Sequence, residues 1–350
     1  MPSAEIAVPR AAAPLLEARG LTKHFRVGGI FSRHTLHAVD QVDLAIHPRE
    51  IVAIVGESGS GKSTVARLLA GVYRPTAGEI FHHGRALSQM RSRRAMLAYR
   101  GRVQMVFQDP YSSLNPVYPA ARGIFRALKL HRKDLGRDAR RQEVLRILES
   151  VGLTPSREFI RKYPHELSGG QRQRYGFAQA LASRPETILA DEPVSMLDVS
   201  IRLGVLNVMA ELRRQEDVSF LYITHDIASA RYIADRILVM YAGQVAESGL
   251  VEDVLAGPKH PYTQLLLSAV PDPRAELDVT AADKGEPPRV IDPGEGCRFR
   301  WRCPYRIEIC DRVTPALSPV GPGQMAACHV AAGVAVGESS ATATPPASGR

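Results

Sequence analysis

A polar, glycine-rich stretch is the part of this 350-residue chain whose residue types most clearly suggest chemistry. In order, it consists of Gly56, Glu57, Ser58, Gly59, Ser60, Gly61, Lys62, Ser63 and Thr64. Glycines at this spacing allow a tight turn in which backbone N–H groups point inward at phosphate oxygens. Lys62 is placed to reach the β- and γ-phosphates of a nucleotide, and the Ser63 hydroxyl is placed to hold Mg²⁺. The stretch therefore predicts a phosphate-binding P-loop, with a chance match in an ordinary glycine-rich turn as the alternative.

Two adjacent carboxylates follow an apolar run at residues 187–190, which reads as a strand. Asp191, at the carboxyl end of this strand, can hold Mg²⁺ through its water shell. Glu192 lies one residue further, where it can polarise the water that attacks the γ-phosphate. Acids at a strand end are often ordinary surface charges. Their combination with a P-loop favours a catalytic role.

A second anion site is predicted where a small, polar segment enters the helix expected at residues 170–183. The segment contains Ser168, Gly169, Gly170 and Gln171. The exposed N–H groups of a helix start, the helix dipole and a serine hydroxyl together suit a phosphate, although a plain serine N-cap is the alternative. An intervening helical block holds this site away from the P-loop in one subunit. Two subunits meeting head to tail would close one site over the other.

The elements around these motifs predict an α/β fold. The apolar run Ile51–Val55 precedes the P-loop, and a helix expected at residues 65–72 follows it, which is the strand–loop–helix order that a P-loop requires. Further strands are expected at 16–25, 37–46, 79–81, 103–107, 187–190, 220–224 and 237–241, and helices at 139–151, 170–183, 199–216 and 226–235. Strands alternating with helices predict a P-loop NTPase core with a mostly parallel sheet, an antiparallel edge subdomain and a helical subdomain inserted at about 109–183.

Six motifs in a fixed order resemble the nucleotide-binding subunit of an ATP-binding cassette (ABC) transporter. They are a Walker A at 56–64, a Q-loop at 106–110, a signature at 167–171, a Walker B at 187–192, a D-loop at 195–198 and a switch histidine, His225. The resemblance covers residues 15 to about 255. It implies an ATPase coupled to transmembrane transport, in which ATP and Mg²⁺ bind between two subunits.

The resemblance also implies roles for individual residues. Gln108 would touch Mg²⁺, together with Ser63 and Asp191, and relay occupancy of the site to a membrane partner. His225 would contact the γ-phosphate, and Asp198 would communicate across the dimer. Phe25 lies where the family places an aromatic side chain that stacks on adenine, although a phenylalanine at a strand end is also common in a core. Met196 in the D-loop departs from the alanine expected there, which affects packing rather than chemistry.

Residues 108–116 and 259–266, with 268–271, resemble the oligopeptide/dipeptide (and nickel) importers. The resemblance implies an ATPase that energises peptide import from the cytosolic face of a bacterial inner membrane. Its partners would be membrane permease subunits, a second ABC ATPase subunit of the same or a different kind, and an extracytoplasmic solute-binding protein. The permease would dock near residues 111–118, for which local packing is the alternative. A soluble ABC ATPase acting on ribosomes or DNA, an importer of nickel or another small solute, and a metal or redox sensor stay open.

All four cysteines fall within a short part of the chain, at Cys297, Cys303, Cys310 and Cys328. A cytosolic setting disfavours disulfides, and four thiolates suit a [4Fe–4S] cluster or Zn²⁺. The spacing lacks the paired knuckles of common zinc modules. A structural cluster, zinc, and free or oxidised thiols stay open, with His329 as an alternative ligand.

Composition limits the other classes of function. The net charge is +9, but the densest basic stretch, residues 85–102, has few aromatic residues and matches no nucleic-acid motif. A basic face beside anionic lipid headgroups explains it as well, so we expect no nucleic acid. No apolar run reaches the length of a membrane span. We expect a disordered leader at 1–14, the ATPase domain at 15–255, a cysteine-containing extension at 256–330 and a disordered tail at 331–350.

Overall fold

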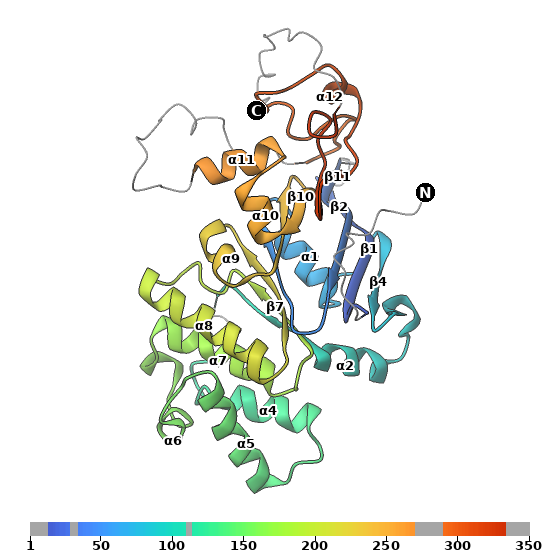
Figure 1. Ribbon diagram of the computed structural model, residues 1–350. Coiled ribbons are helices and arrows are strands. Elements are labelled where there is room, and N and C mark those ends of the chain that lie inside the picture. The colour runs from blue at the N-terminus through green and yellow to red at the C-terminus, as the bar shows by residue number, and fades with distance from the viewer. Residues whose placement is uncertain (1–12, 29–33, 110–113, 270–289, 334–350) are drawn as a thin grey trace.

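The computed structural model describes residues 13–28, 34–109, 114–269 and 290–333 (Figure 1). Most of the predicted leader and tail, and the start of the predicted permease-docking segment 111–118, lie outside these ranges. Within them, no helix combines the length and the apolar character needed to cross a lipid bilayer.

An eight-stranded sheet forms the centre of the molecule, and five adjacent strands of it run parallel, as predicted. In spatial order these are β9 (Arg236–Tyr241), β3 (Ile51–Val55), β8 (Ser219–Thr224), β7 (Thr187–Asp191) and β6 (Val103–Val106). The fully buried, β-branched and aliphatic side chains of β3 are typical of a strand covered on both faces. Because the strands are parallel, their carboxyl ends meet at one edge of the sheet.

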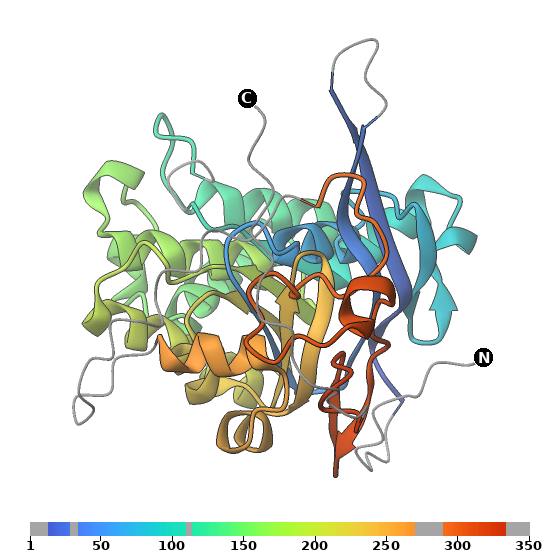
Figure 2. The same cartoon turned by 90° about the horizontal axis from the view of Figure 1, so that it is seen from above.

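Three antiparallel strands that we did not predict extend this sheet beyond β9. They are β10 (Gln244–Leu250), β12 (Gln324–Ala326) and β11 (Ser318–Gly321). We call the described residues that follow α10, 257–269 and 290–333, the C-terminal segment. Because Glu247 of β10 pairs with Ala326 of β12, this segment adds its strands β11 and β12 directly to the main sheet. In Figure 2 this segment, coloured orange to red, lies beside the blue strands of the N-terminal sheet.

A separate four-stranded antiparallel sheet forms the predicted edge subdomain. Its order is β2 (His34–Ile46), β1 (Leu16–Val27), β4 (Ala77–His82) and β5 (Arg85–Ala86). The register of the long β1–β2 ribbon shifts three times, and such irregularities increase the local twist of a strand pair.

Two cores lie on opposite faces of the main sheet, and the side chains of β3 alternate between them. Ile51, Ala53 and Val55 pack on the side of α7 (Gly169–Leu181) and α8 (Val199–Gln215). Val52 and Ile54 pack on the side of α1 (Lys62–Leu69), β1 and β2. This alternation holds the P-loop, which connects β3 to α1, between two rigid layers.

The predicted helical subdomain consists of α4 (Arg122–His131), α5 (Arg137–Ser150) and α6 (Ser156–Phe159), packed against α7. Figure 1 places these helices at one end of the molecule and α12 (Ile309–Arg312) at the other. The remaining helices are α2 (Arg93–Arg102), α9 (Ile227–Ile233), α10 (Val251–Ala256) and α11 (Pro261–Ser268).

Candidate functional site

The glycines of the P-loop are required by close backbone approaches. A Cβ atom on Gly61, whose φ is 102°, would lie 2.2 Å from the carbonyl oxygen of Ala38. A Cβ atom on Gly56 would lie 2.2 Å from the carbonyl oxygen of Met240. Any larger residue would therefore push β2 or β9 away from the loop.

The side chain of Lys62 lies inside the P-loop, where Nζ donates to the carbonyl oxygens of Gly56 at 2.7 Å and Glu57 at 2.8 Å. Burial lowers the pKa of Lys62, and the charges of Glu192 and Asp191 oppose that effect. Among the described residues, carbonyl oxygens are the hydrogen-bond partners of this buried ammonium group, and an anion beside it would stabilise its charge. The geometry therefore fits the binding of a phosphate group.

Hard oxygen donors lie beside the lysine. Ser63 Oγ donates to Asp191 Oδ1 at 2.7 Å, which joins the start of α1 to the end of β7. Burial raises the pKa of Asp191, against the opposing hydrogen bond from Ser63. A hydroxyl and a buried carboxyl that has no cationic hydrogen-bond donor in the described part of the chain form a donor set of the kind that Mg²⁺ prefers. These residues fit a magnesium site.

Three predicted catalytic side chains meet at the carboxyl ends of neighbouring strands. Glu192 Oε2 lies 3.2 Å from Nε2 of Gln108, which follows β6. The same oxygen lies 3.3 Å from Nδ1 of His225, which follows β8. Glu192 has a φ of 46°, a left-handed conformation that is uncommon outside glycine. Its N–H donates to the carbonyl oxygen of Ile223 at 2.9 Å, and the strained backbone turns the carboxylate toward the other two groups.

These groups open into one pocket of about 1020 Å³, large enough for a nucleotide. The P-loop residues Gly56–Ser58, Gly59 and Gly61–Thr64 line it together with Gln108, Glu192 and His225. Ser60 is buried beneath the loop, and its Oγ has no hydrogen-bond partner among the described residues.

Phe25 also lines the pocket, together with Val27, Leu36 and His37. Its ring is only partly buried and meets the ring of Tyr73 edge to face, with 5.5 Å between the centroids. Of the two alternatives for Phe25, a core side chain and an aromatic wall for a base, this placement favours the second.

The second predicted anion site lies outside this pocket. None of Ser168–Gln171 or Asp198 is among the described residues that line it. Ser168 caps α7 by accepting the N–H of Gln171 at 3.3 Å, while Gln171 Oε1 accepts the N–H of Ser168 at 3.1 Å. Gly170 packs so closely that a Cβ atom would lie 2.3 Å from Ile201 Cγ2. Asp198 is exposed at the start of α8.

Sequence reasoning missed the contribution of the C-terminal segment to this site. Tyr262 Oη accepts the N–H of Glu57 at 2.9 Å, and Arg302 forms an ion pair with the Glu57 carboxylate. Leu266 and Val290 also line the pocket. The only sequence signal was the family-like pattern around residues 259–266, which says nothing about where the segment folds.

The four cysteines gather in this C-terminal segment and form no disulfide. Burial raises the pKa of Cys297 to about 11 and that of Cys303 to about 12, and the charges of the other cysteines add to both effects. The backbone N–H groups of Phe299 and Tyr305 act in the opposite direction. Four soft sulfur donors that lie close enough for their charges to interact, two of them buried and two partly buried, fit a bound metal group. His329 Nε2 instead lies 2.9 Å from the carbonyl oxygen of Val313.

Two family models match the chain. One, described as "ABC transporter", matches residues 39–195, and the other, "Oligopeptide/dipeptide transporter, C-terminal region", matches residues 246–310. The chain is 42% identical over 320 residues to the "Putative oligopeptide transport ATP-binding protein YkfD" of Bacillus subtilis, a match covering 91% of this chain and 95% of the relative. It is 41% identical over 322 residues to "Oligopeptide transport ATP-binding protein AppF" of the same organism, covering 90% and 97%.

Solved structures agree with these relatives. The ATP-binding cassette MJ0796, in a dimeric post-hydrolysis state bound to ADP and Pi, is 28% identical with a TM-score of 0.59, covering 67% of this chain and 98% of that chain. The protein cbiO1 of Clostridium perfringens, part of the ABC transporter complex cbiONQ, is 26% identical with a TM-score of 0.60, covering 69% and 91%. Because the matched regions, the near full-length relatives and the fold agree, the chain belongs to the ABC transporter family of ATP-binding proteins, in its oligopeptide/dipeptide branch.

Proposed function

We propose that this chain is the ATPase subunit that energises import of oligopeptides or dipeptides through a membrane permease. The observation that carries the proposal is the pocket itself, in which the P-loop faces Gln108, Glu192 and His225. The peptide-transporter-type C-terminal region at residues 246–310 and the names of the relatives support the choice of substrate class over nickel or another small solute. The same relatives do not favour a ribosome- or DNA-acting ATPase.

In the proposed reaction, Glu192 removes a proton from the water that attacks the γ-phosphorus of ATP. His225 orients that water and contacts the γ-phosphate, while Gln108 reports on occupancy of the site. Lys62 and the P-loop N–H groups hold the β- and γ-phosphates, and the ring of Phe25 stacks on the base. Ser63 and Asp191, with Gln108 beside them, would hold Mg²⁺, which supplies positive charge against the phosphate oxygens.

Two such subunits, or one and a related companion, would act as a pair. The placement of Ser168–Gln171 and Asp198 outside the pocket supports a site completed by the neighbouring subunit. Closing of the pair on ATP would move permease subunits at the cytosolic face of the membrane, and an extracytoplasmic solute-binding protein would deliver the peptide.

For the cysteines we propose a structural [4Fe–4S] cluster rather than Zn²⁺. Tetrahedral zinc with four thiolates places the sulfur atoms about 3.8 Å apart, given Zn–S bonds of about 2.3 Å. No three of the four sulfur atoms, all of which lie in the described part of the chain, come within 4.8 Å of one another. The absence of a closer trio of sulfur atoms does not favour a single zinc ion, and the charge of Arg300, which acts to lower the pKa of Cys297, would offset the negative charge of a thiolate-bound cluster.

Affinity purification of the protein from native membranes, followed by identification of the proteins bound to it, tests the proposed transport function. We expect permease subunits and a peptide-binding protein, and peptide uptake that is lost in a strain carrying Glu192→Gln. Recovery of ribosomal proteins without a permease, or uptake of metal ions but not of peptides, would contradict the proposal. Anaerobic purification with a visible absorption spectrum and elemental analysis decides between iron and zinc.

A further inference from the structure

The segment between Cys297 and Cys303 reaches the P-loop through Arg302. Its Nη1 donates to Glu57 Oε2 at 2.8 Å and its Nη2 to Glu57 Oε1 at 2.9 Å, a two-point ion pair between residues 245 positions apart in the chain. The two side chains are 12% and 25% exposed. Because the pair is largely desolvated and makes two parallel hydrogen bonds, it holds the Glu57 carboxylate in one position and one orientation relative to Arg302, which an exposed salt bridge does not do.

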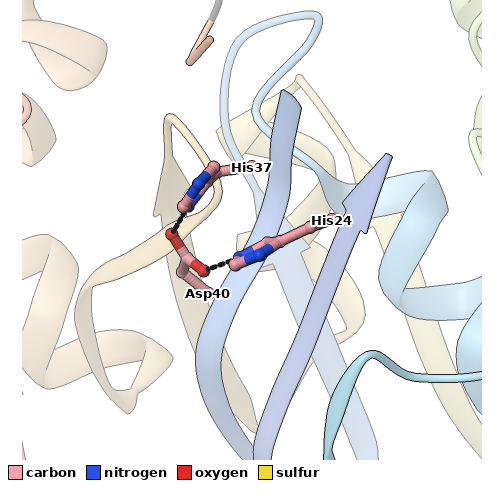
Figure 3. Close-up of side chains that lie close together, drawn as sticks. All are labelled: His24, His37 and Asp40. Carbon is pink, nitrogen blue, oxygen red and sulfur yellow. Dashed lines mark hydrogen bonds and ion pairs between the residues drawn. The ribbon is translucent and has the colours of Figure 1, made fainter. Parts of the chain in front are cut away.

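A second arginine of the same segment reaches strand β2 beside the pocket. Arg298 donates to Asp40 Oδ2 and to the carbonyl oxygen of Ala242. Asp40 also lies 2.5 Å from Nε2 of His24 and 2.9 Å from Nδ1 of His37, a residue that lines the pocket (Figure 3). Although burial acts to raise the pKa of Asp40, the hydrogen bonds from His24 and Arg298 outweigh it and lower the pKa. The aspartate is thus already paired with a cation, so we interpret this cluster as an ion-pair network rather than a metal site.

Phe299, one of the three residues between these arginines, anchors the segment in the protein core. Phe299 is 2% exposed, and its ring centroid lies 5.2 Å from that of Tyr241 and 5.6 Å from that of Tyr262. Tyr262 in turn accepts the N–H of Glu57, whose carbonyl oxygen accepts Lys62 Nζ. Glu57 is therefore held at its backbone and at its side chain by the C-terminal segment, while its carbonyl positions the lysine that faces the phosphates.

We propose that Arg302 is a positioning residue for the nucleotide site, and that it couples ligand binding at the four cysteines to nucleotide binding. The coupling part of this inference rests on the metal group proposed above. Cys297 and Cys303 end the segment, and Arg302 is the neighbour of Cys303, so a ligand held by both cysteines fixes the path of the backbone that carries the guanidinium group. Such coupling is reciprocal: a bound nucleotide stabilises the loaded cysteine site by the same factor.

Arg302→Met, measured in the full-length protein against Arg306→Met, tests the positioning role. Arg306 belongs to the same C-terminal segment but pairs with Asp311 and lies over the ring of Trp301. We expect Arg302→Met to raise the Kd of Mg-ADP and the KM for ATP about 5- to 30-fold, with kcat at saturating ATP near the wild-type value and metal content unchanged. Arg306→Met should leave all of these unchanged, and Arg302→Lys should recover part of the affinity because it keeps the charge. A metal-loaded Arg302→Met variant with wild-type Kd would overturn the positioning role.

Loss of metal to a chelator, followed by absorbance with and without Mg-ADP, tests the coupling. We expect Mg-ADP to slow metal loss from the wild-type protein about 5- to 30-fold and to have little effect in Arg302→Met. Equal rates with and without Mg-ADP in the wild-type protein would overturn the coupling. Wild-type protein that holds no iron or zinc after anaerobic purification would overturn the proposed metal group and the coupling together, while the comparison of Arg302→Met with Arg306→Met would still decide the positioning role.

Discussion

Protonation of His260 should destabilise the C-terminal side of the nucleotide site as the pH falls. His260 is 3% exposed, and its Nδ1 caps α11 by accepting the N–H of Tyr262 at 3.0 Å. Burial lowers the pKa of His260 from 6.5 to about 4, against a hydrogen bond with the backbone of Ala327 that acts to raise it. The ring is therefore neutral near pH 7, and a proton on Nδ1 would remove the cap.

The direction of the effect follows from the two protonation states. Because the pKa of His260 is lower in the folded protein, the unfolded chain binds more protons between about pH 4 and 6.5. The free energy of unfolding contributed by His260 is therefore fully present above pH 6.5 and is lost as the pH falls through this window. The difference between 6.5 and about 4 corresponds to about 3 kcal/mol, most of which is lost by pH 4.5.

Urea unfolding followed by the fluorescence of Trp301, the only tryptophan of the chain, measures this loss in the segment concerned. The matched variant is His260→Asn, whose side-chain oxygen can still accept the N–H of Tyr262 but does not titrate. Between pH 7 and 4.5 the wild-type protein should lose about 2–3 kcal/mol more of its free energy of unfolding than the variant, because the carboxylates titrate equally in both. Equal losses would refute the assignment to His260. If Mg-ADP binding weakens at low pH in the wild-type protein but not in His260→Asn, the loss of the cap also acts on Glu57, whose N–H donates to Tyr262 Oη.

Three further substitutions test the site. Glu192→Gln should lower kcat by about 10²- to 10⁴-fold, because the amide cannot take the proton of the attacking water. The variant should also trap an ATP-bound pair of subunits, which light scattering would detect. Full turnover by a monomeric variant would contradict the mechanism. Gly170→Ala should destabilise the protein by about 1–3 kcal/mol, because the new Cβ would lie 2.3 Å from Ile201 Cγ2. In a single subunit it should leave the Kd of Mg-ADP unchanged in calorimetry, since the residue lies outside that subunit's own pocket and would face only the nucleotide of a neighbouring subunit. A weaker Kd in the monomeric variant with normal thermal stability would argue against this. Phe25→Ala should weaken Mg-ADP binding about 2- to 10-fold, because the ring no longer stacks on the base. The control is Phe81→Ala, on the neighbouring strand β4 and outside the pocket, which should leave Mg-ADP binding unchanged. Equal effects of the two substitutions would indicate a structural role for both rings.

The gathering of Gln108, Glu192 and His225 could be predicted from the sequence because each follows a strand of one parallel sheet. Parallel strands present their carboxyl ends at one edge, so identifying the strands was enough to place the residues together. The start of the helix that follows the P-loop was harder to predict. We expected it to begin at residue 65, but α1 begins at Lys62, directly after Gly61 in its left-handed conformation. A glycine-rich segment carries no periodicity that marks where a helix begins.

The sequence by itself determined the chemistry of this protein: the phosphate loop, the paired acids, the order of the motifs and the alternation of strands and helices all depend on local residue types and spacing. Only the tertiary structure decided that the C-terminal segment adds strands to the main sheet and that Arg302 and Tyr262 hold Glu57. Local patterns report which residues are buried and in which element, whereas an ion pair between residues 245 positions apart depends on the path of the whole chain between them.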